Sequence, residues 1–509
     1  MMTRALSART LLFMGLLLTG RRSLASAPEL KEQPKRIAVV GAGIGGTAAA
    51  YFLRQEFGVE VKIDLFESGT VGGRLATEQI GGAEYETGGA IIHPLNLHMK
   101  HFLDRLGLSQ RREVPSKMAI FDGEQLSFEE SDWFIVNFLR MLWRYGFSFL
   151  RMQMWVEGVL DKFMRIYQYQ QFGYSFSSVE RLLHAMGGDS FLLLANQTLE
   201  EAMLGAGFSQ NFLNDIVAPV TRVNYGQSVR INGFVGAVSL AGADSGLWAV
   251  DGGNKKVCSG LLYHSKAQLI PARVTAISTK HRPLRTGGMA SLYEVSYVGE
   301  FGSAHALYDI VIVATPLHQG LSQIAFHGFT PSIPSHFPGR YHQTVSTLVH
   351  GVLNTSFLGI TDPPSQFLAS DILTMEHRDS IINSLSSIDP VHIPKGYSRP
   401  PASARKIWKV FSPQPLTEDQ LSKIFLSWDA ISEKRWLAYP SYNQPLRRTP
   451  PFILHERLYY LGAVEWAASA MEMSAISARN LALLAHHRWH EQEDRIDQED
   501  LHTRLRSEL

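Results

Sequence analysis

The sequence has a single cysteine, Cys258, among 509 residues. One cysteine excludes both an intrachain disulfide and a cysteine-based zinc site. The net charge is also close to zero, because 48 Lys and Arg residues face 47 Asp and Glu residues and leave +1. Nucleic-acid-binding proteins normally show a strongly basic face, so the charge gives no support for that class. Hydrophobic residues make up 45% of the chain, which predicts a globular protein, and its length predicts two or more domains.

Beyond the N-terminal region, no segment reaches the ~18 uninterrupted apolar residues that a transmembrane helix needs. The N-terminal region itself has Arg4 and Arg9, a short apolar run from Leu11 to Leu18, and then Ala25-Ser26-Ala27. A basic start, an apolar stretch and a small-x-small site together predict a secretory signal peptide over residues 1–27. A transit peptide is the alternative, because the segment is rich in arginine and lacks acidic residues.

Two N-glycosylation acceptor patterns fit passage through the secretory pathway, although such triplets also arise by chance. They begin at Asn196 and at Asn354. We therefore expect a lumenal or secreted mature protein, without a basis in these patterns for choosing between a lysosome and the extracellular fluid.

A nucleotide-binding signature follows the signal region. Residues 36–40 have the pattern of a buried strand and lead directly into the glycine-rich turn 41–46, a helical stretch at 47–55 and a second strand at 61–66. The glycines that define this turn are Gly41, Gly43, Gly45 and Gly46. In such a βαβ unit, glycines allow a tight turn, close approach of the backbone to a pyrophosphate, and packing of the helix on the strands. Glu67, about twenty residues further on, is placed to accept the ribose hydroxyls.

Two further glycine pairs follow Glu67. Gly72-Gly73 precedes Arg74, and Gly88-Gly89 follows Thr87. Backbone amides of paired glycines can reach phosphate oxygens, and arginine supplies a charged, multidentate donor. In order and spacing these segments resemble the FAD-dependent amine oxidase and phytoene desaturase superfamily. The resemblance implies FAD as the cofactor, with the Gly-Gly-Arg turn along its pyrophosphate and the second pair near the flavin ring.

Later segments extend this resemblance. Residues 250–254 precede a helical stretch, residues 269–277 contain two strand patterns, and residues 308–316 form a buried strand with an Ala-Thr-Pro end. Residues 458–462 precede a helix rich in small residues at 467–485. The resemblance implies further cofactor contacts at Val274, Glu465, Met471 and Glu472. A helix start beside the flavin would stabilise negative charge on the reduced ring.

These segments predict an α/β fold in which a Rossmann-type FAD-binding domain is interrupted by an α+β substrate domain. The FAD-binding domain takes residues 35–110, 236–330 and 446–490. The substrate or cap domain takes residues 111–235 and 331–445, and residues 491–509 form a C-terminal tail.

The first intervening segment is rich in aromatic residues between 133 and 167. Core packing explains most of these rings, and a lid over a long apolar substrate is the functional alternative. Arg140, Arg144 and Arg151 fall within ~40° of each other on an ideal helix, unless Gly146 interrupts it. A solvated helix face explains this stripe, and the alternative is a membrane or lipoprotein surface.

Long matches narrow the resemblance further. The stretches EYETGGAIIHPLNLHMK, APVTRVNYGQS and WAASAMEMSAISARN resemble the prenylcysteine oxidase family, also called prenylcysteine lyase, from about residue 35 to the C-terminus. Gly88-Gly89 and residues 93–96 are closer to the oxidase proper than to the oxidase-like paralogues. The resemblance implies an FAD-dependent thioether oxidase of lysosomes that is also associated with lipoproteins. Such an enzyme uses O2 to cleave farnesyl- or geranylgeranyl-cysteine to cysteine, a prenyl aldehyde and hydrogen peroxide.

The residue inventory suits this chemistry, because the flavin performs the difficult step and the protein positions and desolvates the substrate. His93 is the candidate catalytic side chain, for binding the substrate carboxylate or activating water, against the alternative of a histidine satisfied within the scaffold. His93, His98 and His101 do not form a recognised metal-ligand pattern, and we predict no metal. Cys258 is interpreted as a buried small hydrophobic residue.

Two other functions remain open at the level of sequence. One is a different flavin amine oxidase or desaturase acting on an apolar substrate. The other is a prenyl-binding carrier without catalysis, like the Rab GDP-dissociation inhibitors, and the intact glycines, Glu67 and Arg74 argue against it.

Overall fold

A computed structural model describes residues 33–243, 246–283, 289–360, 367–377, 380–442 and 449–507. The predicted signal peptide, residues 1–27, lies outside these residues. From Pro34 onward the chain forms one compact unit. Within the described part, no helix is both long and apolar enough to cross a membrane.

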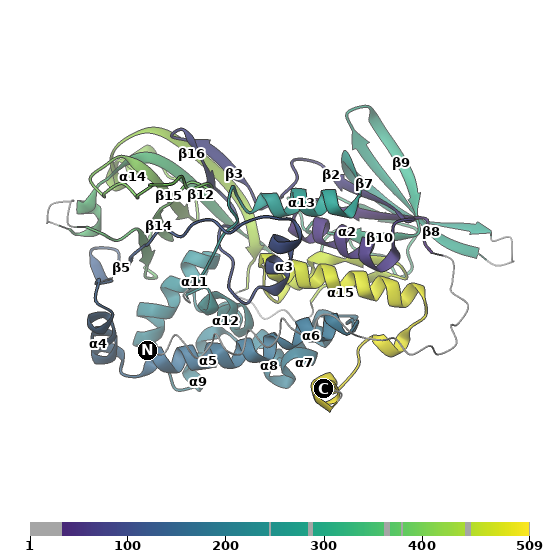
Figure 1. The fold of residues 1–509 in the computed structure, drawn as a ribbon, viewed down its shortest axis with the longest axis horizontal. Helices are drawn as coiled ribbons and strands as arrows, with labels where there is room; N and C mark the ends of the chain where they lie inside the picture. Colours follow the sequence, from purple (N-terminus) through teal and green to yellow (C-terminus); the bar gives the residue numbers. More distant parts are fainter. Residues whose placement is uncertain are drawn as a thin grey trace. The chain divides into compact units, whose positions relative to one another are not determined.

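One sheet collects the strands of the predicted cofactor-binding segments. Its order in the described residues is β17-β18-β10-β1-β2-β7-β8-β9, and β11 pairs with β7 off this path. β18, β10, β1, β2 and β7 pair with one another in parallel (Figure 1). β17 at one edge and β8 and β9 at the other extend this part of the sheet as antiparallel strands. The strands are β1 (Arg36–Val40), β2 (Lys62–Glu67), β7 (Gln268–Pro283), β8 (Met289–Gly299), β9 (Gly302–Tyr308), β10 (Ile310–Val313), β11 (Ala325–His327), β17 (Ile453–His455) and β18 (Leu458–Tyr460).

Helices pack beside the parallel part of this sheet. Helix α2 (Ile44–Phe57) lies between α13 (Lys255–Ser265) and α15 (Met471–Trp489), and α3 (Leu97–Arg105) packs against α15 (Figure 1). The central strands have mostly buried side chains, as expected for parallel strands that are covered on both faces. β10 is a continuous apolar run, whereas β2 contains the buried Asp64, which pairs with Arg36 of β1. The predicted first strand, helix and second strand are therefore confirmed as β1, α2 and β2.

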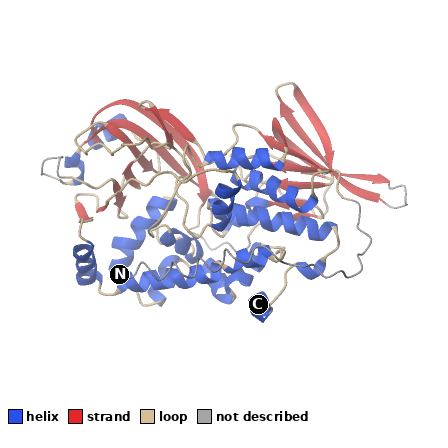
Figure 2. Ribbon diagram, viewed as in Figure 1, coloured by secondary structure: helices blue, strands red, loops and turns tan. Residues whose placement is uncertain are grey.

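A second sheet is built from the two intervening segments. Its order in the described residues is β16-β12-β15-β14-β13-β5-β6, and β3 pairs with β4 as a separate hairpin. These strands lie at one end of the view in Figure 2, and the first sheet at the other. They are β3 (Thr77–Ile80), β4 (Ala83–Glu86), β5 (Met118–Phe121), β6 (Leu126–Glu129), β12 (Tyr341–Leu353), β13 (Asp371–Thr374), β14 (Ser384–Ser387), β15 (Lys406–Ser412) and β16 (Phe425–Pro440).

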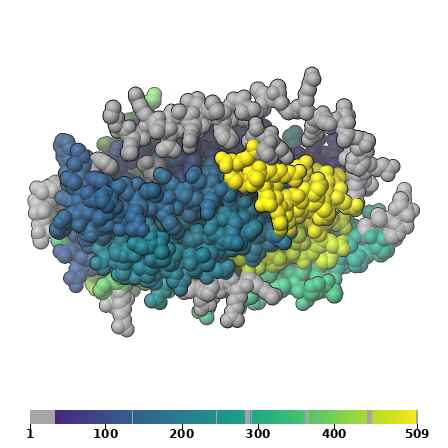
Figure 3. Space-filling model, turned by 90° about the horizontal axis from the view of Figure 1, so that it is seen from below, coloured from purple at the N-terminus to yellow at the C-terminus, as the bar shows by residue number. Residues whose placement is uncertain are grey.

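The remaining helices follow one another between residues 134 and 241. Coloured blue and teal in Figure 3, they form much of the visible face, beside the yellow C-terminal segment. They are α4 (Phe134–Tyr145), α5 (Ser148–Phe163), α6 (Arg165–Gln171), α7 (Val179–Gly187), α8 (Asp189–Asn196), α9 (Leu199–Gly205), α10 (Gln210–Phe212), the π-helix η2 (Leu213–Val217), α11 (Ala218–Tyr225) and α12 (Gly233–Ala241). Short helices elsewhere are η3 (Thr355–Leu358), α14 (Glu418–Ile424), η5 (Leu461–Trp466), η6 (Glu493–Arg495) and α16 (Leu501–Ser507).

The predicted arginine stripe does not exist as one helix face. Gly146, with a φ of 59°, ends α4 and separates it from α5. Each arginine hydrogen-bonds back onto the protein: Arg140 donates to the Glu129 carbonyl, Arg144 to the Asp215 carboxylate, and Arg151 to the Ala206 carbonyl. The three arginines are exposed but lie on two separate helices, so they do not form the single helix face that the sequence predicted.

Core packing is also wrong for several of the aromatic residues in this region. Trp143 is 92% exposed and Trp133 is 73% exposed. Phe147 is exposed as well. These rings lie on the outer side of α4 and at the start of α5, where no other described element covers them. They form an apolar surface instead of a core.

Candidate cofactor and active site

The glycine-rich turn between β1 and α2 forms a cradle of bare backbone. Gly41 has a φ of 104°, and its amide donates to the Phe66 carbonyl at 2.8 Å. Gly43 is the N-cap of α2 and has no side chain to cap the first amides. It forms a parallel bridge with Gly72, whose amide donates to the Ala42 carbonyl at 2.9 Å. The two predicted phosphate-binding turns therefore lie side by side at the N-terminus of a 14-residue helix.

Several of the predicted glycines are required by close packing. A Cβ on Gly46 would lie 1.8 Å from the Gly41 carbonyl oxygen, and one on Gly88 would lie 1.9 Å from the Arg74 carbonyl oxygen. A Cβ on Gly45 would lie 2.7 Å from the Leu461 side chain, so Gly45 lets α2 approach η5. Gly89 donates its amide to the Arg74 carbonyl at 3.1 Å. The second Gly-Gly pair is thus held directly against the Gly-Gly-Arg turn.

Glu67 ends β2 at the edge of this cradle. One carboxylate oxygen accepts the Ala42 amide at 2.8 Å, and the other accepts the Gly69 amide at 2.7 Å. Each carboxylate oxygen has more than one acceptor position, so the side chain remains able to accept ribose hydroxyls. Its placement agrees with the predicted role, and it also holds the glycine-rich turn in position.

Arg74 and Glu465 are brought together by the fold. Nη1 of Arg74 donates to Oε2 of Glu465 at 3.1 Å and to the Ala438 carbonyl at 2.7 Å. Burial acts to lower the pKa of Arg74, but the adjacent Glu465 carboxylate outweighs it and raises that pKa. Tyr341 donates to the same carboxylate at 2.9 Å. The guanidinium predicted to reach a pyrophosphate is therefore paired with another predicted cofactor residue.

Glu472 lies in the first turn of α15, where Met471 begins the helix. Its buried carboxylate accepts the His98 and Met99 amides at 2.7 and 3.0 Å and the Tyr167 hydroxyl at 2.8 Å. Burial raises the pKa of Glu472 to about 7, against the opposing effect of these donors. The Glu472 carboxylate thus caps the N-terminus of α3. What Glu472 can offer a cofactor is its backbone amide, in the first turn of α15. Met471 faces Gly89, with its Cε 3.8 Å from the position of a Cβ there.

His93 lies on the loop that leaves the second Gly-Gly pair. Its Nδ1 accepts the Leu95 amide at 3.1 Å, and the next residue back, Ile92, bridges to Trp248. The catalytic role of His93 stays a prediction, because the imidazole is partly engaged by its own loop. Among the described residues, no group of three or more His, Cys, Asp or Glu side chains is arranged to hold a metal ion.

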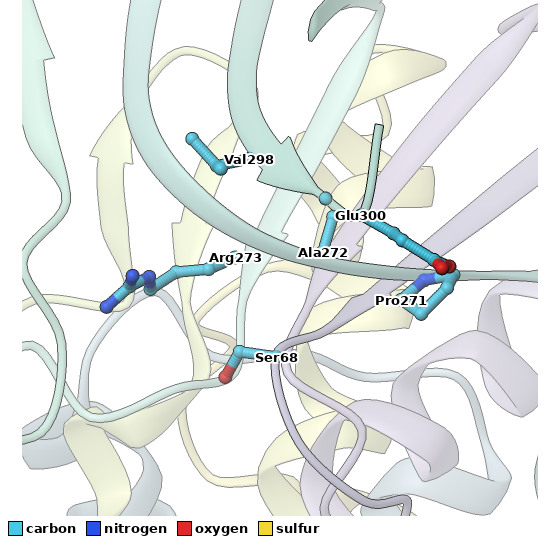
Figure 4. Close-up of a pocket in the computed structure, with 7 residues that line it drawn as sticks. Ser68, Pro271, Ala272, Arg273, Val298 and Glu300 are labelled. Carbon is cyan, nitrogen blue, oxygen red and sulfur yellow. The ribbon is translucent and has the colours of Figure 1, made fainter. Parts of the chain in front are cut away.

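Val274 lies in β7, opposite Tyr297 of β8, and is buried. Beside it, a cavity of about 390 Å³ opens at the carboxyl end of β2 (Figure 4). In the close-up, Ser68, which follows Glu67, lies below the strand that carries Pro271 and Arg273. The lining residues are Ser68, Pro271, Ala272, Arg273, Val298, Gly299 and Glu300. This cavity adjoins the end of the cradle at Glu67, where the ribose is predicted.

Other residues at the site were not predicted individually. The backbone amide of Asn254 donates to the Glu86 carboxylate at 2.7 Å, and its side-chain amide donates to the Gly89 carbonyl at 2.9 Å. Trp436 of β16 donates to the Thr87 carbonyl at 3.2 Å. Asn254 belongs to the 250–254 segment that the sequence had singled out, whereas no local pattern distinguishes Trp436 from other exposed-strand residues. Cys258 is buried in α13, and burial raises its pKa to about 12.

Taken together, these residues fit FAD. An uncapped helix N-terminus and two glycine turns accept a pyrophosphate. A carboxylate at the end of β2 suits a ribose. A second glycine pair is held against the Gly-Gly-Arg turn by the Gly89 amide.

Two family models match the chain. A family model for prenylcysteine lyase matches residues 128–498, and one for an NAD(P)-binding Rossmann-like domain matches residues 39–106. Prenylcysteine oxidase 1 from Homo sapiens is 54% identical over 94% of this chain and 94% of its own length. The Mus musculus protein of the same name is 52% identical over 98% of both chains. The human prenylcysteine oxidase 1-like protein is 47% identical over 94% of this chain and 95% of its own.

Solved structures confirm the fold class. Cyclohexylamine oxidase from Brevibacterium oxydans aligns with a TM-score of 0.55 at 14% identity, covering 90% of this chain and 99% of that one. A putrescine oxidase variant aligns with a TM-score of 0.56 at 16% identity, covering 89% and 99%. The predicted α/β architecture with a Rossmann-type domain is therefore confirmed, as is the greater similarity to the oxidase than to the oxidase-like proteins. On full-length identity above 50%, the chain belongs to the prenylcysteine oxidase family, also called the prenylcysteine lyase family.

Proposed function

We propose that this chain is an FAD-dependent oxidase that cleaves S-prenylated cysteine to cysteine, a prenyl aldehyde and hydrogen peroxide. O2 is the electron acceptor, and water supplies the aldehyde oxygen. Family membership makes the chain an oxidoreductase. The observation that carries the proposal within this chain is the intact cradle, in which the Gly43–Gly72 bridge and Glu67 meet at the start of α2. A carrier without catalysis has no need of this arrangement.

Bound FAD supplies the two-electron acceptor for the carbon between sulfur and the prenyl double bond. The protein's own residues then have three tasks. The turns at Gly43 and Gly72 hold the pyrophosphate. The Arg74–Glu465 pair fixes the C-terminal segment against the Gly-Gly-Arg turn, and the Gly88-Gly89 segment lies beside the ring. The reaction does not need a nucleophilic side chain from the protein. The buried Cys258 is therefore not required as a nucleophile.

Anaerobic addition of farnesylcysteine to the purified yellow protein tests this function. We expect the oxidised flavin band to bleach, and readmitted oxygen to restore it with one thiol and one hydrogen peroxide formed per turnover. A protein without a flavin band is a carrier. Bleaching by an amine or a polyene, but not by farnesylcysteine, identifies a different oxidase or a desaturase.

We also propose peripheral association with a lipid surface, through exposed apolar residues of α4 and α5. We call this set the apolar ridge: Trp133, Ile135, Leu139, Trp143, Phe147, Leu150 and Met154. Soluble monomers rarely expose apolar patches of this kind without a binding function, and tryptophan favours membrane–water interfaces. Since the arginines of this region are bonded back onto the protein, apolar insertion drives the association.

Vesicle flotation separates this idea from the arginine stripe. Replacing Trp133 and Trp143 by serine should lower vesicle binding about tenfold or more, because each buried large side chain contributes ~1.5–3 kcal/mol. Phe301→Ser is the matched control, since Phe301 is fully exposed at 100% in the turn between β8 and β9. Equal flotation of the double variant and the wild type, or dimerisation through the ridge in the absence of vesicles, contradicts the proposal.

We propose a secretory-pathway location, with the lysosome ahead of the extracellular fluid. Support comes from the signal-like N-terminus and from Asn196, whose side chain is exposed at the end of α8. Both side-chain amides donate to a backbone carbonyl at 2.9 Å, Asn196 to Leu192 and Asn354 to Lys423. Asn354 is half-buried, so the greater exposure of Asn196 makes it the better acceptor. A mobility shift on glycosidase treatment that is lost in Asn196→Gln supports this location, and an unglycosylated protein from a eukaryotic host argues against it.

A further inference from the structure

One face of the second sheet carries polar side chains beneath the predicted flavin segment. Along β12, side chains alternate between the two faces of the sheet, so His342, Thr344, Ser346, Leu348 and His350 share one face. At one end of this row, Leu348 packs with Ile80 and Tyr85 of the β3–β4 hairpin. The hairpin therefore covers that end of the face.

The other end of the row is covered by α11. Gly226, which caps α11, lies so close to His342 and Asn383 that a Cβ on it would be 2.7 Å from His342 Nε2 and 3.1 Å from Asn383 Nδ2. Thr344 and Ser346 lie between this point and the hairpin. The middle of the face is thus bounded by two elements that cover its ends.

The segment that leads to the second Gly-Gly pair runs over this middle part. Trp436, directly opposite Thr344 across the strands, donates to the Thr87 carbonyl at 3.2 Å. Lys409, opposite Leu348, donates to the Glu86 carbonyl at 3.2 Å. The face therefore lies directly beneath residues 86–87, next to the Gly88-Gly89 backbone where the cofactor ring is predicted.

Polar atoms on this face are buried without hydrogen-bond partners. Thr344 Oγ1, Ser346 Oγ, Asn383 Nδ2 and His342 Nε2 have none among the described residues. Ser346 is 0% exposed, Asn383 3% and Thr344 6%. Buried polar groups are nearly always hydrogen-bonded in native proteins, so these four side chains, which we call the polar strip, indicate a polar ligand.

A buried charge lies at the edge of the polar strip. Lys409 is only 6% exposed. Its ammonium group lies 4.7 Å from the centre of the Phe411 ring, and Phe411 is opposite Ser346. Within the described residues, its one hydrogen bond goes to the Glu86 carbonyl. The Glu86 carboxylate acts on this ammonium from beyond 4.0 Å and partly offsets the lowering of the Lys409 pKa by burial. A buried ammonium with unused donor positions is a natural partner for a ligand carboxylate.

We infer that the polar strip and Lys409 form the subsite for the amino-acid end of the substrate. The α-carboxylate of the substrate binds the Lys409 ammonium. The hydroxyl oxygens of Thr344 and Ser346 accept hydrogen bonds from the α-ammonium group. The prenyl chain then points away from the sheet, and the sulfur-bearing carbon lies between, near Gly88-Gly89. This inference rests on the proposed function, because it assumes that the substrate keeps a free amino-acid group.

S-dodecyl-L-cysteine tests the subsite by binding alone. Its thioether lacks the allylic double bond, so the ligand is expected to bind without being oxidised. Two truncated ligands accompany it: 2-(dodecylthio)ethylamine lacks the carboxylate, and 3-(dodecylthio)propanoic acid lacks the amine. Calorimetric titration of the flavin-loaded protein should give the full amino acid about tenfold or more tighter binding than either truncated ligand.

The variants then assign the two groups. In Lys409→Met, S-dodecyl-L-cysteine should bind no more tightly than the carboxylate-free ligand, and the affinity for the carboxylate-free ligand should be unchanged. In the double variant Thr344→Val and Ser346→Ala, S-dodecyl-L-cysteine should bind no more tightly than the amine-free ligand. Lys406→Met is the matched control: Lys406 is also a buried lysine of β15, but it lies over Trp408 and donates to the Pro400 carbonyl. It should change none of the three affinities.

Three outcomes overturn the inference. In the first, Lys409→Met weakens all three ligands equally, which is the result of a structural role. In the second, Lys406→Met has the same effect as Lys409→Met. In the third, the wild type binds the three dodecyl ligands equally well, which leaves the proposed function standing but removes the subsite. Absence of binding by any of them counts against the proposed function itself. If Lys409→Met does not fold with its flavin, the Thr344 and Ser346 variants carry the test.

Discussion

Arg74 and Glu465 are 391 positions apart in the sequence and form an ion pair at the centre of the site. The pair joins the Gly-Gly-Arg turn to the short helix that precedes α15. Glu465 also accepts from Tyr341 of β12, so the second sheet meets the two cofactor segments at this carboxylate. Its integrity is therefore expected to matter for folding as well as for cofactor binding.

Replacing Arg74 by methionine should destabilise the protein by about 3–5 kcal/mol, because it leaves the buried Glu465 charge without a partner. Replacing both residues, as Arg74→Met with Glu465→Gln, should recover a substantial part of that loss. Chemical denaturation of the flavin-loaded proteins measures both effects. Additive losses in the double variant would show that the two side chains act independently.

Gly46→Ala should prevent the normal approach of α2 to the first turn. Its Cβ would lie 1.8 Å from the Gly41 carbonyl oxygen, a distance that only a backbone shift can relieve. We expect loss of flavin from the purified protein or failure to fold. Gly158→Ala in α5 is the control, since a Cβ there meets nothing within 4 Å and alanine favours a helix by ~1 kcal/mol over glycine. A yellow, stable Gly46→Ala protein would contradict the packing argument.

Glu67→Ala should weaken FAD binding by ~1.5–3 kcal/mol, the range for a hydrogen bond to a charged group. The variant also loses the contacts to the Ala42 and Gly69 amides, so the turn itself becomes less ordered. Flavin fluorescence on dilution gives the dissociation constant. Glu60→Ala, at an exposed position just before β2, should leave it unchanged. Equal affinity in Glu67→Ala and wild type would mean that Glu67 does not contact the ribose.

Glu472 makes stability depend on pH in a defined direction. Its pKa in the folded protein, about 7, is above the ordinary value of 4.5 because the carboxyl is buried. The folded state therefore favours the protonated form, and this contribution is complete below pH 4.5 and is lost as the pH rises to 7. Relative to wild type, Glu472→Gln should gain about 1–3 kcal/mol of stability between pH 4.5 and 7. A difference that does not change with pH would refute this assignment, and Glu157→Gln, exposed on α5, is the control.

Cys258 should be unreactive in the folded protein. Burial raises the pKa of its thiol to about 12, so very little thiolate exists at pH 8. We expect alkylation by iodoacetamide only after denaturation, and nearly unchanged turnover in Cys258→Ser. Rapid labelling of the native protein, or loss of flavin bleaching in the serine variant, would point to a chemical role for this cysteine.

The local sequence was sufficient for the first βαβ unit. The glycine spacing, the buried strand patterns and Glu67 are all determined over a few dozen residues, and β1, α2 and β2 form where these patterns predict them. The same holds for the buried Cys258 and for the division of α4 from α5 at Gly146, because a glycine with positive φ ends a helix regardless of its distant neighbours.

Only the tertiary structure determined which distant residues the charged side chains of the site contact. Arg74 and Glu472 were predicted as separate cofactor contacts, yet one side chain pairs with Glu465 and the other caps α3, since burial requires each charge to find a nearby partner. Core packing was expected for most aromatic residues between 133 and 167, but Trp143 is 92% exposed, and hydrophobicity alone cannot show which helix face is covered. The polar strip was overlooked for a related reason. His342, Thr344 and Ser346 alternate along one strand, but their unpartnered burial follows only from the hairpin and α11, which close over the same face from distant parts of the chain.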